Sequence, residues 1–385
     1  MRVTVAIDSL KGSLSSLEAG EAARRGVLTA APGAEVTVLP LADGGEGTVR
    51  ALTAAGGRLI TLTVTGPLGA PTEAEYGILS DGTAVIEMAA AAGLPLLTPE
   101  ERDPTRTTTF GVGELIADAL RRGCRRLLIG IGGSATNDGG AGMLEALGFR
   151  LLDRDGRQIP RGGAALASLA SIDASAVLPL LSECKILVAS DVENPLCGER
   201  GASAVYGPQK GASPAEVALL DSALSHFAEV SAALLGRDHS AHAGAGAAGG
   251  LGFALLAFLG ARIASGASLV IEETGLASAI AASDLVITGE GRLDGQTALG
   301  KAPIGVAHEA KKHGIPTFAV GGAVTEEADA LHECGIDAFF PILDAPRTLA
   351  EAMEPDRAAR NIERTVREAV RLYLAAKSSH TTDIP

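Results

Sequence analysis

The sequence of 385 residues contains no tryptophan, three tyrosines and eight phenylalanines. Proteins stack nucleobases on aromatic side chains, so this scarcity argues against a single-stranded nucleic-acid binder. Positive charge is also in deficit, with 32 Lys and Arg against 46 Asp and Glu and a formal net charge of −14. A net acidic chain repels phosphate polymers and anionic lipid, so we expect neither nucleic acid nor a membrane as partner.

Cysteine is scarce as well, with four residues far apart in the sequence and no CxxC pair. This pattern supports neither a zinc site nor a disulfide framework, and it predicts a reduced, cytoplasmic protein. Residues 243–261 carry no charge and approach the length of a membrane span. Because five glycines occupy the start of this run, we interpret it as a glycine-rich loop leading into a buried helix.

Short β-branched runs alternate with helical patterns at both ends of the chain, which is typical of parallel βαβ units. The expected strands are residues 3–7, 35–39, 285–288, 317–320 and 338–342. Between them, hairpin strands are expected at residues 59–64, 73–78 and 84–87, followed by helices and buried strands. The predicted fold is therefore α/β, with a doubly wound parallel-sheet domain of Rossmann or flavodoxin type built from both chain ends, residues 1–65 and 283–385. A second α/β domain, residues 66–282, is inserted between them.

The first strand ends in Asp8, Ser9 and Lys11, just before a predicted helix. In an open parallel sheet the carboxyl ends of the strands form the ligand-binding edge. Lys11 can neutralise a phosphate or carboxylate there, and Asp8 and Ser9 can contact the same ligand. The competing interpretation is an ordinary capped helix with a solvated lysine.

The second strand ends in a segment with two carboxylates, Asp43 and Glu46, around the paired glycines Gly44 and Gly45. Carboxylates at this spacing suit a Mg²⁺ site or hydrogen bonds to substrate hydroxyls. An acidic helix N-terminus capped by Asp43 explains the same residues equally well.

Residues 127–131 form a buried strand that enters a loop with five glycines in eleven residues, 132–142. A strand followed by such a loop and a helix presents backbone N–H groups to an anion. We expect Ser134, Thr136, Asn137 and Asp138 to contact substrate or phosphate. Because Asp138 would repel a bare phosphate, a metal ion or a substrate hydroxyl is expected near it.

Asp191 follows another predicted strand, 186–189, and Asn194 lies three residues further on. Asp191 is our candidate for the general base, with Asn194 as a substrate donor. A turn before Pro195 is the alternative role for Asp191.

The segment 288–301 brings acid, base and glycine to a further strand end, through Glu290, Arg292, Asp294 and Lys301. It is a near miss to a P-loop, because Ala302 stands where a P-loop has Ser or Thr. Residues 244–249 match GxGxxG, but no strand precedes them, so we do not interpret them as a dinucleotide site.

Taken together, these segments resemble the type-1 bacterial glycerate kinase family. The matching residues are 8–13, 40–48, 130–142, 191–195, 207–212, 244–252 and 288–294. They occur in family order over nearly the whole chain, with Leu10 standing where the family usually has Phe.

The resemblance implies ATP-dependent phosphorylation of D-glycerate, typically to 2-phosphoglycerate, with Mg²⁺. Lys11, Asp43 and Asp191 are then the candidate catalytic residues, and Asp43 and Glu46 the candidate metal ligands. The alternative is a non-catalytic sensor of a sugar acid or nucleotide. The oligomeric state, a homodimer included, stays open.

Overall fold

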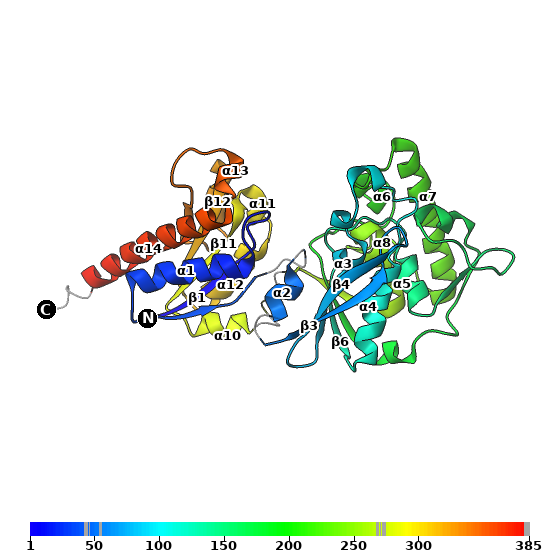
Figure 1. The fold of residues 1–385 in the computed structure, drawn as a ribbon, viewed down its shortest axis with the longest axis horizontal. Coiled ribbons are helices and arrows are strands. Elements are labelled where there is room, and N and C mark those ends of the chain that lie inside the picture. Colours follow the sequence, from blue (N-terminus) through cyan, green and yellow to red (C-terminus); the bar gives the residue numbers. More distant parts are fainter. Residues whose placement is uncertain are drawn as a thin grey trace. The chain divides into compact units, whose positions relative to one another are not determined.

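The computed structural model describes residues 1–41, 45, 47–53, 56–266, 269, 271 and 275–380 (Figure 1). The chain divides into two compact units. Unit 1 comprises Met1–Asp43 and Ala267–Pro385, and unit 2 is the continuous segment Gly44–Gly266. We describe each unit by itself.

Unit 1 is built on a five-stranded, fully parallel sheet with the order β13-β12-β11-β1-β2. In the order in which unit 1 contributes its strands, this is a doubly wound 2-1-3-4-5 arrangement. The direction of strand addition reverses between β1 and β11, and that reversal is where ligands bind in such sheets. The strands are β1 (Arg2–Ile7), β2 (Glu35–Val38), β11 (Leu285–Leu293), β12 (Thr317–Val324) and β13 (Ala338–Pro341).

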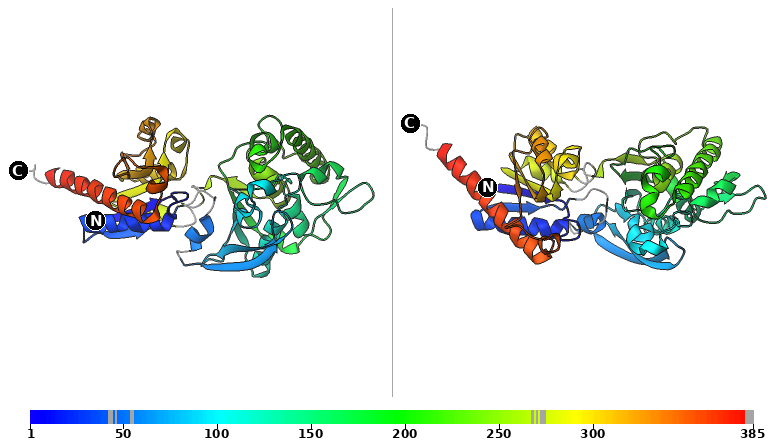
Figure 2. Two further views of the ribbon diagram at one scale, coloured as in Figure 1. Left: turned by 45° about the horizontal axis from the view of Figure 1, so that its top comes forward. Right: turned by 90° about the horizontal axis from the view of Figure 1, so that it is seen from above.

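Helices cover both faces of this sheet. On one face α1 and α14 pack together against β1 and β11, around Val5, Ile287 and Ile362. A separate apolar cluster joins α12 to β12 through Ile304 and Ala319. Figure 2 shows α14, in red, beside α1, in blue. The helices of unit 1 are α1 (Ser16–Ala30), α10 (Leu276–Ala281), α11 (Gly295–Ala298), α12 (Ala302–Lys312), α13 (Leu349–Ala352) and α14 (Pro355–His380), with a 3₁₀ turn at Glu326–Leu331. The predicted doubly wound sheet is thus confirmed.

Unit 2 contains a six-stranded mixed sheet with the order β10-β9-β6-β5-β4-β3. The four strands from β10 to β5 are parallel, while β4 runs antiparallel to both β5 and β3. The strands are β3 (Arg58–Thr65), β4 (Pro71–Ile78), β5 (Ala84–Glu87), β6 (Arg126–Gly130), β9 (Lys185–Ala189) and β10 (Arg262–Ala264). A separate pair consists of β7 (Arg150–Leu152) and β8 (Ser171–Asp173).

The helices of unit 2 surround one large apolar core that includes Tyr76, Phe227 and Phe253. They are α2 (Thr48–Thr53), α3 (Ala89–Ala92), α4 (Phe110–Arg121), α5 (Ala141–Ala146), α6 (Ala202–Tyr206), α7 (Pro214–Leu235) and α8 (Ala247–Leu259). Short 3₁₀ turns lie at Leu94–Leu96, Pro99–Glu101, Gly163–Ser168, Pro179–Glu183 and Pro208–Lys210.

The unit boundaries differ from the expected domain boundaries at residues 65/66 and 282/283. The strand β3 was expected in the first domain, but it pairs along its length with β4 in the sheet of unit 2. The helix α8 ends at Leu259, and Arg262–Ala264 pairs with β9 as the strand β10.

The uncharged stretch of residues 243–261 forms a glycine-rich turn and the helix α8, which is buried from Ala247 to Leu255. Within the described part of the chain, α7 is long and apolar enough to cross a membrane by length and composition, with 33% of its most apolar stretch buried. Since core helices meet the same test, this is weak evidence for a span.

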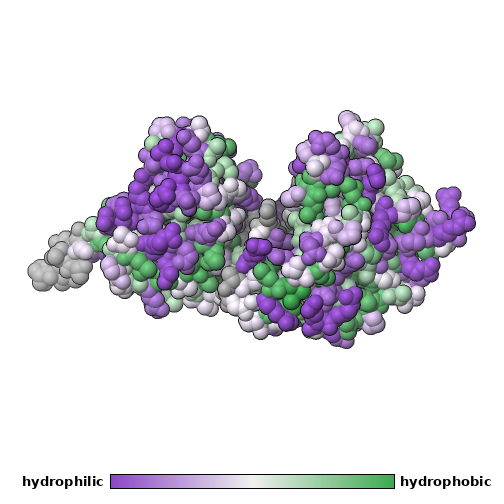
Figure 3. Space-filling model, viewed as in Figure 1, coloured by the Kyte–Doolittle hydropathy of each residue, from purple (hydrophilic) through white to green (hydrophobic). Residues whose placement is uncertain are grey.

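On unit 1, hydrophilic side chains gather around α13 (Figure 3).

Candidate functional site

In unit 1 the first motif lies where the sheet order reverses. The backbone N–H of Asp8 donates to the Gly289 carbonyl at 2.8 Å, which continues the β1–β11 pairing past the end of β1. The Asp8 carboxylate is largely buried and accepts the Ser9 N–H at 2.7 Å. Lys11 follows on the same loop and is exposed. Asp8, Ser9 and Lys11 are therefore brought to the predicted ligand-binding edge.

Glu290 enters the same edge from β11. It is 9% exposed, and its Oε2 lies 3.7 Å from Lys301 Nζ. Burial raises the pKa of Glu290, while the charges of Lys301 and Lys11 act in the opposite direction. Within the described part of the chain, Glu290 Oε1 and Thr288 Oγ1 are buried oxygens without a hydrogen-bond partner. Two unsatisfied oxygens at a ligand-binding edge are groups that a bound ligand or cation would satisfy.

Arg292 and Asp294 form an ion pair, with Nε and Oδ2 3.1 Å apart. Asp294 also caps α11, because its Oδ1 accepts the N–H groups of Gln296 and Thr297 at 2.9 and 3.2 Å. The Arg292 side chain is 66% exposed and the Lys301 side chain 44%. Both cations can thus reach an anion at this edge, whereas Asp294 has a structural task.

Asp43, Gly44 and Glu46 lie outside the described residues, so their assignment stays a prediction. Gly45 is described, and its carbonyl accepts the Thr48 hydroxyl at 2.7 Å. Sequence analysis missed Glu87 at the end of β5, whose carboxylate accepts the N–H groups of Gly47 and Val49 at 3.3 and 2.7 Å. An acid at a strand's carboxyl end was the signal that could have identified it.

In the loop of residues 132–142, Asp138 is completely buried. Its carboxylate accepts the N–H and hydroxyl of Thr109 at 2.8 and 2.9 Å, and the N–H groups of Gly140 and Gly142 at 3.1 and 3.2 Å. Burial raises the pKa of Asp138, and these hydrogen bonds act in the opposite direction. Substrate contact by Asp138 stays a prediction, but its burial favours a role in organising the loop.

The other predicted residues of this loop are also buried. Asn137 donates from Nδ2 to the Ser203 hydroxyl at 2.9 Å, and Ser134 is 7% exposed. Sequence analysis did not assign a role to Lys210, whose Nζ donates to the Thr136 carbonyl at 2.6 Å. Burial lowers the pKa of Lys210 to about 7. At the start of this loop, Gly132 and Gly133 are exposed to solvent.

Asp191 stands exposed after β9, and its Oδ1 accepts the Gly266 N–H at 3.3 Å. Asn194, expected as a substrate donor, uses both ends of its amide within the protein. Its Nδ2 donates to the Arg200 carbonyl and its Oδ1 accepts the Tyr206 hydroxyl, each at 2.8 Å. This arrangement favours a structural role for Asn194, and its substrate contact stays a prediction.

The glycine-rich turn of residues 244–250, which includes the non-helical start of α8, joins the loop of residues 132–142 to the Asp191 segment. The Gly246 N–H donates to the Asn194 carbonyl at 2.9 Å, and the Gly139 N–H donates to the Gly249 carbonyl at 3.0 Å. Gly249 has a φ of +66°, and a Cβ at that position would overlap the Thr136 carbonyl oxygen. Among the described residues, no strand leads directly into this turn.

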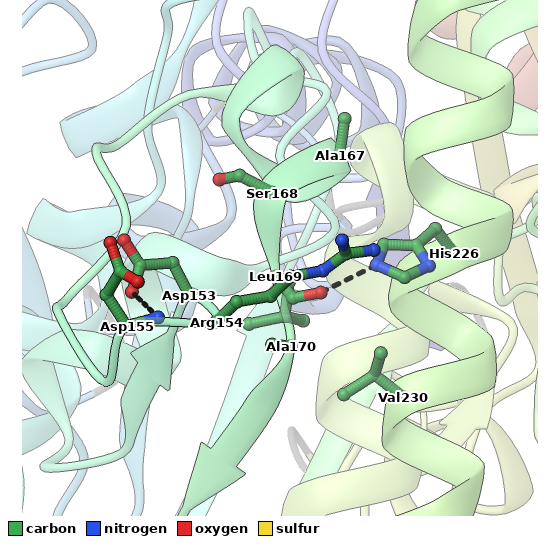
Figure 4. Close-up of a pocket in the computed structure, with 9 residues that line it drawn as sticks. All are labelled: Asp153, Arg154, Asp155, Ala167, Ser168, Leu169, Ala170, His226 and Val230. Atoms are coloured by element: carbon green, nitrogen blue, oxygen red, sulfur yellow. Dashed lines mark hydrogen bonds between the residues drawn. The ribbon is translucent and has the colours of Figure 1, made fainter.

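A pocket elsewhere in unit 2 contains none of the predicted residues (Figure 4). It lies between the β7–β8 region and α7. Its His226 ring is held by a 2.7 Å hydrogen bond between Nε2 and the Leu169 carbonyl. Most of the described candidate residues instead lie in or just after the parallel strands β1, β6, β9 and β11.

Comparisons with known proteins agree on one family. The profile of the glycerate kinase family matches residues 3–374. The chain is 50% identical to a glycerate kinase of Bacillus subtilis (strain 168), covering 98% of this chain and 99% of the relative. It is 49% identical to a glycerate 2-kinase of Escherichia coli (strain K12), covering 95% and 98%.

A crystal structure from Salmonella typhimurium LT2, described provisionally as glycerate kinase 2, superposes with a TM-score of 0.90 at 47% identity. It covers 98% of this chain and 99% of its own. These matches cover nearly the whole chain in both sequence and fold. The chain therefore belongs to the glycerate kinase family, enzymes that transfer a phosphoryl group to an alcohol.

Proposed function

We propose that this enzyme transfers the γ-phosphoryl group of ATP to the 2-hydroxyl of D-glycerate, releasing ADP and 2-phosphoglycerate. The observation that carries the proposal is the near full-length similarity to the glycerate 2-kinase of Escherichia coli. The strand-end residues described above support it, because they supply the cations and carboxylates that the reaction needs.

For phosphoryl transfer, a protein mainly has to position the substrates and neutralise their charge. Lys11, Arg292 and Lys301 are the cations at the carboxyl edge of the unit 1 sheet, and we assign them to the carboxylate and phosphate groups of the substrates. Asp191 accepts the proton of the attacking hydroxyl, whose oxygen bonds to the γ-phosphorus as the bond to ADP breaks.

Magnesium fits the residues of unit 1. Mg²⁺ is usually held by one or two protein carboxylates together with phosphates and water. Glu290 Oε1 is a buried oxygen without a hydrogen-bond partner in the described part of the chain, so it can serve as one such ligand. Among the described residues no group of three or more His, Cys, Asp or Glu could hold a metal ion. Asp43 and Glu46 remain predicted ligands, and bound Mg²⁺ would neutralise charge on the phosphoryl oxygens.

The four cysteines are free thiols, and burial with two nearby carboxylates raises the pKa of Cys197 to about 12. A thiol that stays protonated reacts slowly with oxidants. We infer a cytoplasmic location from the four free cysteines, because disulfides are typical of oxidising compartments.

The purified enzyme is expected to form ADP from ATP only when D-glycerate and Mg²⁺ are present. A coupled ADP assay measures turnover, and phosphorus NMR of the product separates 2-phosphoglycerate from 3-phosphoglycerate. Release of ADP that ignores added glycerate would contradict the kinase assignment. Formation of 3-phosphoglycerate would leave the kinase activity intact and overturn only the position of transfer.

Replacing Lys11 by alanine is expected to lower turnover by roughly tenfold or more, because a substrate anion loses its partner at the point where the sheet order reverses. Lys312→Ala provides a matched control. It removes an exposed lysine from the last turn of α12, where it pairs with Glu309 at 2.6 Å. Near-normal turnover in Lys11→Ala would show that this lysine does not bind a substrate anion.

A further inference from the structure

Lys210 is among the largest fully buried side chains of the described chain, and it belongs to no step of the proposed reaction. It is the last residue of the 3₁₀ turn Pro208–Lys210 and is 1% exposed. Its Nζ donates to the backbone carbonyl of Thr136 at 2.6 Å. A side chain of one segment therefore holds the backbone of the loop formed by residues 132–142.

The surroundings explain why a charged group is used for this contact. A neutral donor could satisfy the Thr136 carbonyl without the cost of burying an ammonium group. The same loop, however, contains the fully buried carboxylate of Asp138, whose charge favours the protonated form of Lys210. The ammonium group thus supports the loop twice, through a hydrogen bond and through charge.

Two further ionisable residues lie beside this segment, Arg102 and Tyr206. The Arg102 carbonyl lies against Gly211, and the Tyr206 hydroxyl donates to Asn194. The charge that favours the protonated form of Lys210 is that of Asp138.

The loop does not satisfy all of its own hydrogen bonds. Thr136 Oγ1 and Asn137 Oδ1 are buried atoms without a partner in the described part of the chain. Its arrangement therefore depends on contacts from other segments. Lys210 bonds the Thr136 carbonyl, Ser203 accepts the Asn137 amide, and Gly249 packs against Thr136. Its exposed start, Gly132 and Gly133, follows β6 at the carboxyl edge of the sheet.

We propose that Lys210 is a positioning residue, which holds the loop of residues 132–142 in the arrangement that binds the anionic substrate groups. It acts through the Thr136 carbonyl and the buried charge of Asp138, without touching substrate. This inference rests on the proposed function, because it assigns the loop to substrate binding.

The test replaces Lys210 by methionine, which keeps most of the volume and removes both the donor and the charge. For the folded variant we expect KM for ATP or glycerate to rise by roughly tenfold or more while kcat changes much less, since the loop contributes binding in ground and transition states alike. Lys210→Gln retains a neutral donor and should recover part of the loss. The matched control, Lys185→Met, removes an exposed lysine at the start of β9.

Hydrogen exchange followed by mass spectrometry measures the order of the loop directly and does not depend on enzyme activity. Lys210→Met should lose amide protection in residues 132–142 while α4 keeps it. If wild type phosphorylates glycerate and Lys210→Met has normal KM and normal loop protection, the proposal is overturned and Lys210 is only a core side chain. If wild type shows no glycerate-dependent turnover, the proposed function fails, and the exchange result still decides whether Lys210 holds the loop.

A titration provides a further check. Burial lowers the pKa of Lys210 from 10.5 to about 7. The unfolded chain therefore binds more protons than the folded one between these values, so Lys210 makes the free energy of unfolding rise with pH across that window. Lys210→Met should remove this part of the rise and Lys185→Met should keep it. An unchanged slope in Lys210→Met would mean that the Lys210 amine is not buried against the loop in solution, which would contradict the proposal.

Discussion

The variant Asp191→Asn is expected to lower turnover by roughly two to four orders of magnitude, because asparagine keeps the size of the side chain but cannot accept the hydroxyl proton. Asp191 is suited to that role by its position directly after β9, where a strand end presents an exposed carboxylate that accepts the Gly266 N–H at 3.3 Å. ATP binding, measured by calorimetry, should survive the substitution.

A carboxylate near the other end of the same strand provides the control. Glu183 precedes β9, its side chain is 61% exposed, and it pairs with Arg125 at 2.9 Å. Glu183→Gln should leave turnover unchanged. If Asp191→Asn keeps most of its activity while Asp43→Asn abolishes turnover without weakening Mg²⁺ binding, the roles of Asp191 and Asp43 are to be exchanged.

The largest expected effect on stability comes from Asp138→Ala. Three backbone N–H groups and the Thr109 hydroxyl would lose a charged acceptor inside the protein. Each unsatisfied buried donor costs about 1–3 kcal/mol, so the free energy of unfolding should fall by at least about 4 kcal/mol. That loss is a large fraction of the total for an ordinary domain.

Urea unfolding monitored by circular dichroism measures this change. Asp173→Ala is the matched control, because Asp173 makes a similar turn contact with the Ser175 N–H at 2.8 Å at an exposed position. It should leave the free energy of unfolding nearly unchanged. An Asp138→Ala variant as stable as wild type would mean that Asp138 is not what holds the loop together.

Local sequence patterns predicted where the strands of unit 1 lie better than they predicted how long those strands are. The strand β11 was expected to end at Thr288, since Gly289 and Gly291 are typical of a loop. In the structure it continues to Leu293 by pairing with β12. A Cβ at Gly289 would overlap the Val320 carbonyl, so here glycine serves close strand packing. That requirement depends on a neighbouring strand that the local pattern does not contain.

In the candidate site, too, local patterns predicted some residues and missed others. The positions of Lys11 and Asp191 followed from strand ends, which are local properties, whereas Glu290 lies within the longer strand β11. The tasks of Glu87 and Lys210 did not follow from local patterns, because each bonds backbone groups far away in the sequence. Burial also changed the interpretation of Asp138, since composition alone cannot distinguish a carboxylate that faces a ligand from one that organises its own loop.

The division of unit 1 between the two chain ends determines when it can form during synthesis on the ribosome. β1 needs β11 beside it, and α1 needs α14, whose backbone at Glu363 lies against Gly26. These partners emerge only near the end of translation, whereas Gly44–Gly266 is continuous and can fold while the nascent chain is still growing. A premature stop before Pro355 would leave the apolar face of α1 uncovered in a product that still contains all of unit 2.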